Sequence, residues 1–587
     1  MFSKMKDNYK YDLVLLHAPS VYDFRKNPIM YGPISDVVPS TPIFEMYPIG
    51  FTTISRYLTN KGFRVRIVNL ALKMLHNPGF DAEKFLRKLD SRIFGIDLHW
   101  LPHAHGSIEV AKLVKNFHPG SKVVFGGLSA TYYYKELMEY PFIDYCIRGD
   151  STEVLLERLI ISLKTGDGFE HIPNLCWRDK KQNTVFNPFD YIPKSLEGIN
   201  IDYKHIFLQA LKNFDFSGYL PFINWVAYPI AVIVLCRGCN CNCKVCGGSK
   251  EFYKNYCNRK ETVYKSAAEV GKEIRALTRF IKGPIFLVGD IFQNGEEYTR
   301  ALLKEFSDAR ISNQIIFEFF VPPDKEQLKE IAGAVPNFNI QLSLQSHDER
   351  IRRAFGRPFG NAEAEEMIEE AIKLGIKRLD IFFMTGLPEQ TRESIRDTVK
   401  YCGYLLSKFA ASKKIALYIS PLAPFIDPGS MVFENPEQYG YKIFYRTLEE
   451  HRQALLKPSW KYMLNYETRW LSRHDIVESS YEAGLELNRL KFIYGLVSKK
   501  ECLRLENRIL KAMELCSTID RILMTSDEPE RNEAFAKLKK KMDSYNVSTI
   551  CDTNELEWST SILGIRIPKF VRSFSFSLWS FLARIAE

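Results

Sequence analysis

Six of the twelve cysteines in this chain fall within 22 consecutive positions, beginning at Cys236 and ending at Cys257. Three of them, Cys239, Cys243 and Cys246, have the spacing C-x3-C-x2-C, which occurs nowhere else in the sequence. Three thiolates on one loop can hold three irons of a [4Fe-4S] cluster and leave the fourth iron open to a ligand from outside the protein. The spacing therefore predicts a metal centre at which chemistry takes place.

Two other interpretations of these cysteines remain open. One is a structural zinc site, although such sites usually combine two separate Cys-x2-Cys hooks. The other is a fully ligated cluster in which Cys236, Cys241 or Cys257 supplies the fourth thiolate. A disulfide framework is disfavoured, because the thiols are clustered in a large chain whose N-terminus shows no signal-peptide pattern.

Composition sets the outer limits on fold and partners. A length of 587 residues suggests about three or four domains. The chain is 46% hydrophobic and 26% charged, which excludes a disordered or low-complexity protein. Its net charge of +10 is too dilute to indicate a nucleic-acid partner, and no run of about 18 apolar residues predicts a transmembrane helix. We expect a cytoplasmic protein that binds no nucleic acid.

The cysteines must be positioned by a larger α/β architecture. In residues 1–165, apolar strand patterns alternate with helical patterns and end in glycines, which predicts a Rossmann-like parallel sheet. Residues 166–225 lose this rhythm and are expected to connect two domains, with a small hairpin around Cys176-Trp177. The strands expected in the first domain lie at residues 11–17, 65–70, 93–98 and 123–125.

A second α/β series begins directly before the cysteines. Its strands alternate with charged helical intervals over residues 226–425, which predicts a partial or full parallel barrel with its chemistry at the carboxyl ends of the strands. A helical cap or substrate region at 426–500 and a helical tail at 501–587 are expected to follow. The barrel strands are expected at residues 230–235, 285–288, 315–320, 340–344, 379–384 and 415–419.

The cysteine motif, placed just after the first barrel strand, resembles that of the radical S-adenosylmethionine (SAM) superfamily. The resemblance implies that SAM occupies the open iron and touches three further segments of the barrel. Asp290 and Gln345 stand where the superfamily usually has Glu, and Val245 stands where an aromatic residue is usual. By resemblance, Gly289 and Asp290 contact the methionine amino group, Ser343 and Gln345 the ribose and carboxylate, and Gly386 and Glu389 the adenine side.

The N-terminal domain resembles the cobalamin-binding domain that precedes many radical SAM barrels. The resemblance rests on Pro48-Ile49-Gly50, on residues 126–131 (GGLSAT) and on Arg148-Gly149-Asp150. A Gly-Gly pair at a strand end lets the backbone approach a bulky ligand closely, and no G-x-G-x-x-G follows the first strand to indicate a dinucleotide. The residues implied to contact cobalamin are Gly126, Gly127, Ser129 and Thr131.

Histidines near the expected cobalamin site allow two interpretations. The chain lacks Asp-x-His-x-x-Gly after its first strand, the motif by which some cobalamin proteins ligate cobalt. Instead His99, His103 and His105 follow a later strand. They either cover the corrin, with one of them near the cobalt, or are solvated loop residues, and we favour the second interpretation.

The C-terminal third offers fewer signals. The tail 565–586 has apolar residues near a 3.6-residue period among Arg and Lys, so it could lie on an anionic membrane surface or dock on the barrel. Aromatic and ionisable residues after the barrel could close a substrate pocket or pack as a helical cap. These residues are Asp427, His451, Trp460, Tyr466, Glu467 and Arg469.

The resemblance implies an enzyme in which a reduced cluster cleaves SAM to a 5′-deoxyadenosyl radical, with ferredoxin or flavodoxin as the kind of electron donor. With cobalamin, the leading expectation is methylation of an unactivated carbon in a small-molecule or lipid substrate. Cyclisation or rearrangement of a carbon skeleton is the first alternative, and a non-catalytic cobalamin or iron–sulfur sensor is the second. The sequence identifies neither the substrate nor an individual catalytic side chain.

Overall fold

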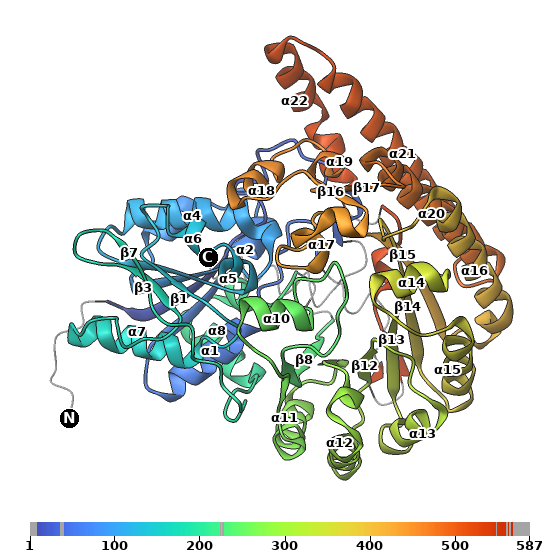
Figure 1. Cartoon of the computed structure of the whole chain (residues 1–587), viewed down its shortest axis with the longest axis horizontal. Helices are drawn as coiled ribbons and strands as arrows, with labels where there is room; N and C mark the ends of the chain where they lie inside the picture. The colour runs from blue at the N-terminus through green and yellow to red at the C-terminus, as the bar shows by residue number, and fades with distance from the viewer. Residues whose placement is uncertain are drawn as a thin grey trace.

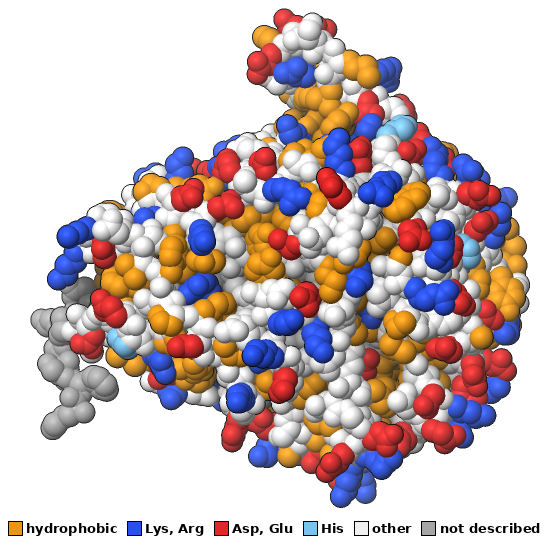
Figure 2. Space-filling view, in the orientation of Figure 1, with side chains coloured by type: hydrophobic (Ala, Val, Ile, Leu, Met, Phe, Trp, Pro, Cys, Tyr) orange, Lys and Arg blue, Asp and Glu red, His pale blue; other side chains and the backbone are white. Residues whose placement is uncertain are grey.

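A computed structural model describes residues 9–35, 40–223, 225, 228–546 and 549–558, together with the short stretches 561–562 and 565–566. Two largely parallel sheets stand side by side, the first from the N-terminal third of the chain and the second from its middle (Figure 1). Helices from the C-terminal third flank the second sheet, and the last two form the projection at the top of Figures 1 and 2. The predicted α/β fold class, with a helical C-terminal region, is confirmed.

The first sheet has the order β2-β1-β3-β4-β5-β6-β7, and its first five strands are parallel. Helices cover both faces and bury two separate sets of apolar side chains. The hairpin expected in the connecting segment, β6 and β7, pairs antiparallel with β5 and so continues this sheet. The strands are β1 (Tyr11–His17), β2 (Val65–Asn69), β3 (Ser91–Asp97), β4 (Lys122–Gly126), β5 (Tyr145–Ile147), β6 (Leu175–Arg178) and β7 (Thr184–Phe186).

The helices of this N-terminal part are mostly crossovers between neighbouring strands, as a doubly wound sheet requires. They are α1 (Gly50–Asn60), α2 (Leu70–His76), α3 (Ala82–Arg87), α4 (Ala104–Phe117), α5 (Leu128–Tyr132), α6 (Tyr134–Leu137) and α7 (Glu153–Thr165). Two more, α8 (Tyr203–Asn213) and α9 (Phe216–Tyr219), lead to the second sheet.

The second sheet keeps its six strands in sequence order, β8-β11-β12-β13-β14-β15, and every neighbouring pair is parallel. This is the partial barrel that the sequence predicted. Its strands are β8 (Ala231–Val234), β11 (Ile285–Val288), β12 (Ile315–Phe319), β13 (Phe338–Gln345), β14 (Arg378–Thr385) and β15 (Ile415–Pro421). Its helices are α10 (Lys250–Tyr256), α11 (Ala267–Phe280), α12 (Glu296–Asp308), α13 (Lys325–Ala334), α14 (Glu349–Phe355), α15 (Asn361–Lys373) and α16 (Arg392–Phe409).

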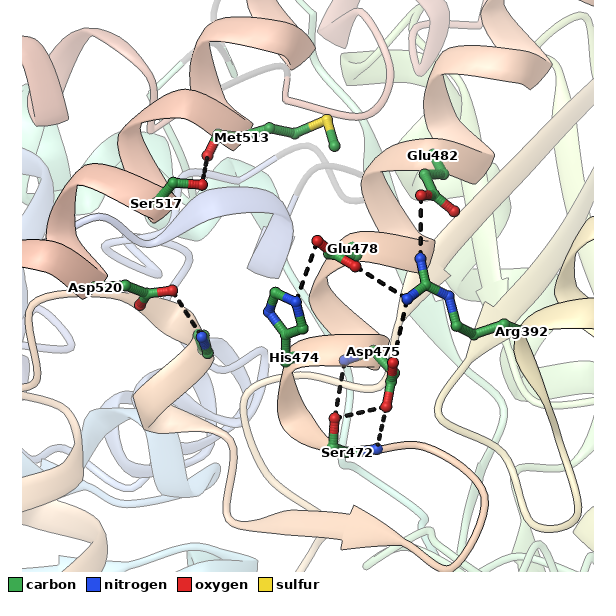
Figure 3. A network of polar contacts seen from close by, with 10 residues as sticks. Arg392, Ser472, His474, Asp475, Glu478, Glu482, Met513, Ser517 and Asp520 are labelled. Atoms are coloured by element: carbon green, nitrogen blue, oxygen red, sulfur yellow. Dashed lines mark hydrogen bonds and ion pairs between the residues drawn. The ribbon is translucent and has the colours of Figure 1, made fainter.

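The C-terminal third packs onto this barrel through one long helix, α20 (Arg473–Ile493), which contacts α16 and β15. Arg392 of α16 bonds three carboxylates spaced along one face of α20, those of Asp475, Glu478 and Glu482, at 3.3, 3.0 and 3.1 Å (Figure 3). The other elements are α17 (Met431–Glu434), α18 (Leu448–Ala454), α19 (Trp460–Met463), α21 (Lys499–Leu523), α22 (Glu528–Ser544) and the hairpin β16 (Tyr441–Ile443) with β17 (Tyr466–Thr468).

Neither the charge pattern of the drawn surface nor the described helices indicate a particular partner. On the face drawn in Figure 2, basic and acidic side chains are interspersed. None of the described helices combines the length and the apolar character that a membrane-spanning segment needs. The amphipathic pattern at 565–586 lies outside the described residues except for 565–566.

Two buried ion pairs hold the sheets against each other. Arg237, three residues beyond the first barrel strand β8, donates to Glu153 at the start of α7, with Nη1 3.1 Å from Oε2. Arg259 forms a two-pronged bond to Asp150, with NH2 2.9 Å from Oδ1. Each pair therefore joins the carboxyl edge of one sheet to the carboxyl edge of the other.

A close backbone contact predicts how one glycine behaves. Gly106, in the first turn of α4, donates to the Ser20 carbonyl at 3.1 Å, and a Cβ at this position would lie 1.7 Å from the Pro19 carbonyl oxygen. Gly106→Ala should therefore destabilise the fold by about 1–3 kcal/mol and lower Tm, because the loop after β1 must move away.

Gly333, in the last turn of α13, is the matched control because open space surrounds its Cβ position. Gly333→Ala should leave Tm unchanged or raise it, since Ala is better than Gly in a helix by up to about 1 kcal/mol. Thermal unfolding of both variants checks this contact. Equal Tm values would contradict the packing described here.

Candidate functional site

The three predicted cysteines lie on one loop, which runs from β9 (Cys236–Arg237) to α10 at the carboxyl edge of the second sheet. Backbone amides already point at two of the sulfurs: Cys241 N–H donates to Cys239 Sγ and Gly248 N–H to Cys246 Sγ, both at 3.3 Å. Burial raises the pKa of Cys246 to about 12. A bound cation would reverse this, because metal binding requires and stabilises the thiolate form.

Cys241 is a fourth thiol on the same loop. Its sulfur accepts from Gln293 Nε2 at 3.2 Å, and Arg357 approaches at 3.8 Å. Its hydrogen bond with Cys239 lowers the pKa of Cys241 and raises that of Cys239. Cys257 is buried at the end of α10, and Cys236 lies beside Gly289. Among the proposed extra ligands, Cys241 therefore shares the immediate surroundings of the predicted set.

The segments expected to contact SAM lie at the ends of β11, β13 and β14, at this same edge of the sheet. Gly289 follows β11 with a φ of +120°, and a Cβ there would lie 3.0 Å from Cys236 Sγ. Burial raises the pKa of the next residue, Asp290, to about 6. Ser343 and Gln345 lie at an irregularity near the end of β13.

The Gln345 side chain carries the clearest sign of a missing partner. Its Oε1 atom is buried and has no hydrogen-bond partner among the described residues. An unpaired buried polar atom costs about 1–3 kcal/mol, so a ligand that donates to it would relieve a real penalty.

The two residues expected on the adenine side of SAM, Gly386 and Glu389, lie in different surroundings. Gly386 follows β14 with a φ of +91°, and a Cβ there would lie 2.2 Å from Tyr466 Oη, so the residue must be small. Glu389 is more than a third exposed, and its Oε2 lies 3.3 Å from Arg350 NH1. Glu389 therefore forms a surface ion pair, whereas Gly386 lies at the end of β14 against Tyr466.

Glu318 of β12, a partly buried acidic residue, was missed by the sequence reasoning. Burial raises its pKa to about 7 against the opposing effect of Arg357, and the carboxylate of Asp290 raises it further. The sequence Ile315–Phe319 (IIFEF) already places an acidic residue inside an apolar strand. Burying a carboxylate in such a strand destabilises the fold unless a partner compensates its charge, so the residue could have been singled out as a functional candidate.

A cavity of about 350 Å³ lies where the two sheets meet. We call it the interdomain cavity. Its first-domain wall is formed by the ends of β3, β4 and β5 and by α1 and α7, and its second-domain wall includes Val234, Cys236, Arg237 and Val288. Gly126 and Gly127 line it. A Cβ on Gly127 would lie 2.5 Å from the His99 backbone, so this position excludes a side chain.

A smaller cavity of about 120 Å³ connects the first domain with the cysteine loop. Ser129 and Trp100 line it from one side, and Gly247 and Gly248, which directly follow Cys246, line it from the other. Asp427 closes it and accepts from Gly247 N–H at 2.9 Å. His99 and Leu128 line both cavities, so the two spaces adjoin.

Thr131 and the histidines differ from expectation. Thr131 Oγ1 donates to the Gly127 carbonyl at 2.8 Å and accepts from Gly149 N–H at 2.9 Å, so its hydroxyl serves the scaffold. The interpretation of His103 and His105 as solvated loop residues is wrong: both are buried, because α4 begins within this segment and packs against the loop after β1. His99 is partly exposed and lies at the cavity wall.

Most candidates after the barrel are part of a packed cap. His451 and Trp460 are fully buried, and Trp460 Nε1 donates to Tyr481 Oη at 3.1 Å. Tyr466 donates to the Leu422 carbonyl at 2.8 Å, Glu467 accepts from Arg473 N–H at 3.0 Å, and Arg469 donates to the Glu437 carbonyl at 2.9 Å. Asp427 alone among the six candidates reaches the cysteine loop.

Comparison with protein-family models gives two matches. Residues 36–159 match the B12 binding domain, and residues 233–402 match the radical SAM superfamily. An uncharacterized methyltransferase of Pyrococcus horikoshii, PH0819, is 24% identical over 328 residues, which are 55% of this chain and 66% of that protein. The anaerobic magnesium-protoporphyrin IX monomethyl ester cyclase of Cereibacter sphaeroides is 24% identical over 51% of this chain and 47% of its own length. The chain thus spans less than two-thirds of either relative.

Solved structures share the whole architecture. The radical SAM methyltransferase TsrM from Kitasatospora setae, with cobalamin and a [4Fe-4S] cluster bound, aligns with a TM-score of 0.55 at 15% identity over 91% of this chain and 99% of its own. The cobalamin-dependent SAM radical enzyme OxsB, with aqua-cobalamin and SAM bound, aligns at 0.54 and 13% identity over 98% and 79%. These likenesses show a common fold.

The raised pKa of Glu318 predicts a pH-dependent stability. The carboxyl has a pKa of about 7 in the folded chain and about 4.5 when unfolded, so the stability it contributes is complete below pH 4.5 and is lost as pH rises through 7. Glu318→Gln removes this loss and should gain up to about 3 kcal/mol over the wild type at pH 8, but little at pH 5. Melting curves across this range test it, and a pH-independent difference between the two proteins would contradict the burial of this carboxyl.

Proposed function

This chain is a B12-binding radical SAM protein, and on that premise we propose that it is an enzyme that methylates an unactivated carbon with the help of a [4Fe-4S] cluster, SAM and cobalamin. One observation carries the proposal: the interdomain cavity and the small cavity adjoin at His99 and Leu128. A group bound by the first domain is thereby brought against the cysteine loop of the second.

Cys239, Cys243 and Cys246 are the proposed cluster ligands. Their loop supplies the soft thiolates that iron–sulfur clusters require, together with amide donors to two of the sulfurs. When bound, the cluster and SAM supply a reduction and a carbon radical, and cobalamin supplies a methyl carrier. The protein residues contribute ligation, orientation and exclusion of water.

The proposed SAM contacts fit a cationic ligand. Asp290 is a buried carboxyl whose pKa is raised by burial, so an ammonium group nearby would favour its ionised form. Gln345 Oε1 offers an unused acceptor, and Gly289 and Gly386 keep the strand ends open. Ser343 completes the proposed set, whereas the contact first expected from Glu389 would require it to leave Arg350.

The interdomain cavity suits an apolar part of a larger cofactor, since its volume of about 350 Å³ is too small for a whole corrin. It is lined mainly by apolar side chains and enters the first domain between the sheet and helices α1 and α7. Gly126 and Gly127 present backbone to the cavity, and Ser129 lines the smaller cavity. We assign these three residues to cobalamin and give Thr131 the supporting role of fixing Gly127.

Methylation is preferred to other outcomes because two relatives with this fold or sequence, PH0819 and TsrM, carry methyltransferase names. Carbon-skeleton cyclisation remains the second candidate, since the Cereibacter sphaeroides relative is named as a cyclase. In either case we propose a small-molecule or lipid substrate and a ferredoxin- or flavodoxin-type reductant.

Variants of the cysteines test the proposed ligand set. In anaerobically reconstituted protein, Cys243→Ala should reduce bound iron to less than half and abolish conversion of SAM to 5′-deoxyadenosine, because one iron loses its thiolate. Cys257→Ala is the matched control and should keep both iron and SAM cleavage. Loss of iron in both variants would favour the fully ligated cluster with Cys257 as a ligand. Wild-type spectra that do not respond to SAM would favour the sensor alternative.

The type of reaction is tested by isotope transfer. With SAM labelled in its methyl group and an extract of the source cells as substrate, methylation predicts label in a cobalamin-dependent product. Cyclisation predicts a product that contains no label and has lost hydrogen. Unlabelled products alone would overturn the methyltransferase assignment without affecting the radical SAM assignment.

A further inference from the structure

Three buried side chains of the first domain converge at the wall of the interdomain cavity, which one of them, Asp97, lines. His17 ends β1, Asp97 ends β3, and His103 lies in the short helix η2 (Leu101–His103) that precedes α4. One nitrogen of each histidine and one carboxylate oxygen lie within 4.8 Å of one another. The three residues are only 0%, 4% and 1% exposed.

The hydrogen bonds of His17 and His103 to backbone carbonyls use one nitrogen of each ring and leave the other nitrogen able to bind a metal ion. His17 Nε2 donates to the Phe44 carbonyl at 2.8 Å, and His103 Nδ1 donates to the Ala18 carbonyl at 3.1 Å. Because a carbonyl can only accept, these bonds assign one proton to each ring and leave His17 Nδ1 and His103 Nε2 as the unprotonated nitrogens of the neutral imidazoles. A backbone carbonyl behind each imidazole is the usual outer shell of a metal-bound histidine.

We propose that His17, Asp97 and His103 bind a divalent transition metal ion, with Zn²⁺ the best match. Two neutral imidazoles and one carboxylate are a donor set that zinc prefers, and three protein ligands leave one position for a water. The distance of 3.0 Å between His17 Nδ1 and Asp97 Oδ1 suits two atoms that share one ion. An ion would also compensate a carboxylate that is almost completely removed from solvent.

The cluster contains no cysteine, and its two histidines do not line the interdomain cavity, although Asp97 does. The second oxygen of Asp97 bonds His99 Nδ1 at 2.7 Å, and His99 itself lines the cavity. An ion held by Asp97 would therefore fix the orientation of the His99 ring. Thus a structural metal ion would position the residue that the first domain presents between the two cavities.

The backbone around the site is built to bring these loops together. Phe44, whose carbonyl accepts the hydrogen bond from His17 Nε2, has a left-handed φ of +53°, which is an unfavourable conformation for a residue with a side chain of this size. The contact of Gly106 with Pro19 and Ser20 fixes the loop after β1 against the start of α4. The ion would thus cross-link the loops that follow β1 and β3.

Metal analysis of the full-length protein tests the proposal. Protein purified anaerobically from zinc-supplemented cells should contain about one zinc per chain in addition to iron and cobalt. X-ray absorption at the zinc edge should show nitrogen and oxygen ligands without sulfur, which distinguishes this site from zinc on the cysteine loop. His103→Gln should lose this zinc, whereas His118→Gln, a control in the same domain whose ring bonds the Leu86 carbonyl, should keep it.

Two further measurements keep the result interpretable. The triple variant Cys239→Ala, Cys243→Ala, Cys246→Ala should retain the zinc, so failure of the proposed enzymatic function would leave this site unaffected. Chelation of zinc from the wild type should lower Tm, and added zinc should restore it, even if His103→Gln folds poorly. Absence of zinc from the wild type, or a sulfur shell around it, would overturn the proposal and leave a hydrogen-bonded imidazole–carboxylate cluster.

Discussion

The structure depends on two buried ion pairs that join the carboxyl edges of two sheets. Arg237 directly follows Cys236 and bonds Glu153, while Arg259 follows α10 and bonds Asp150. Breaking such a pair by removing one partner typically costs about 3–5 kcal/mol, because a buried charge is left uncompensated. Since both arginines flank the cysteine loop, the same contacts that hold the domains together place that loop against the first domain.

The enclosed space has consistent electrostatics. Asp290 is buried, whereas Glu318 and Asp427 are partly buried, and in all three residues burial raises the pKa of the carboxyl group. The cysteine loop adds thiols whose ionisation is also disfavoured by burial. These groups favour cationic ligands, because a metal ion or a sulfonium nearby would stabilise the ionised forms of the carboxyls and thiols.

The sequence predicted what depends on local pattern. The C-x3-C-x2-C spacing and the β8 strand before it are contiguous, so the cysteine loop could be located without a structure, and all six barrel strands followed from apolar runs. It could not predict pairings across long separations. His17 and Asp97 are 80 residues apart, and nothing in either segment indicates the other. Glu318 was visible only as an anomaly in a strand, and the hairpin β6–β7 carried no sign of which sheet it would extend.

In the proposed enzyme, cobalamin and the iron–sulfur cluster occupy adjoining spaces of one protein interior. Pulsed electron paramagnetic resonance on protein that holds both, with the cluster reduced and the cobalt as Co(II), measures this directly. The structure predicts a dipolar interaction that accelerates relaxation of the cobalt signal when the cluster is reduced. A cobalt signal that relaxes identically with the cluster reduced or oxidised would contradict the account.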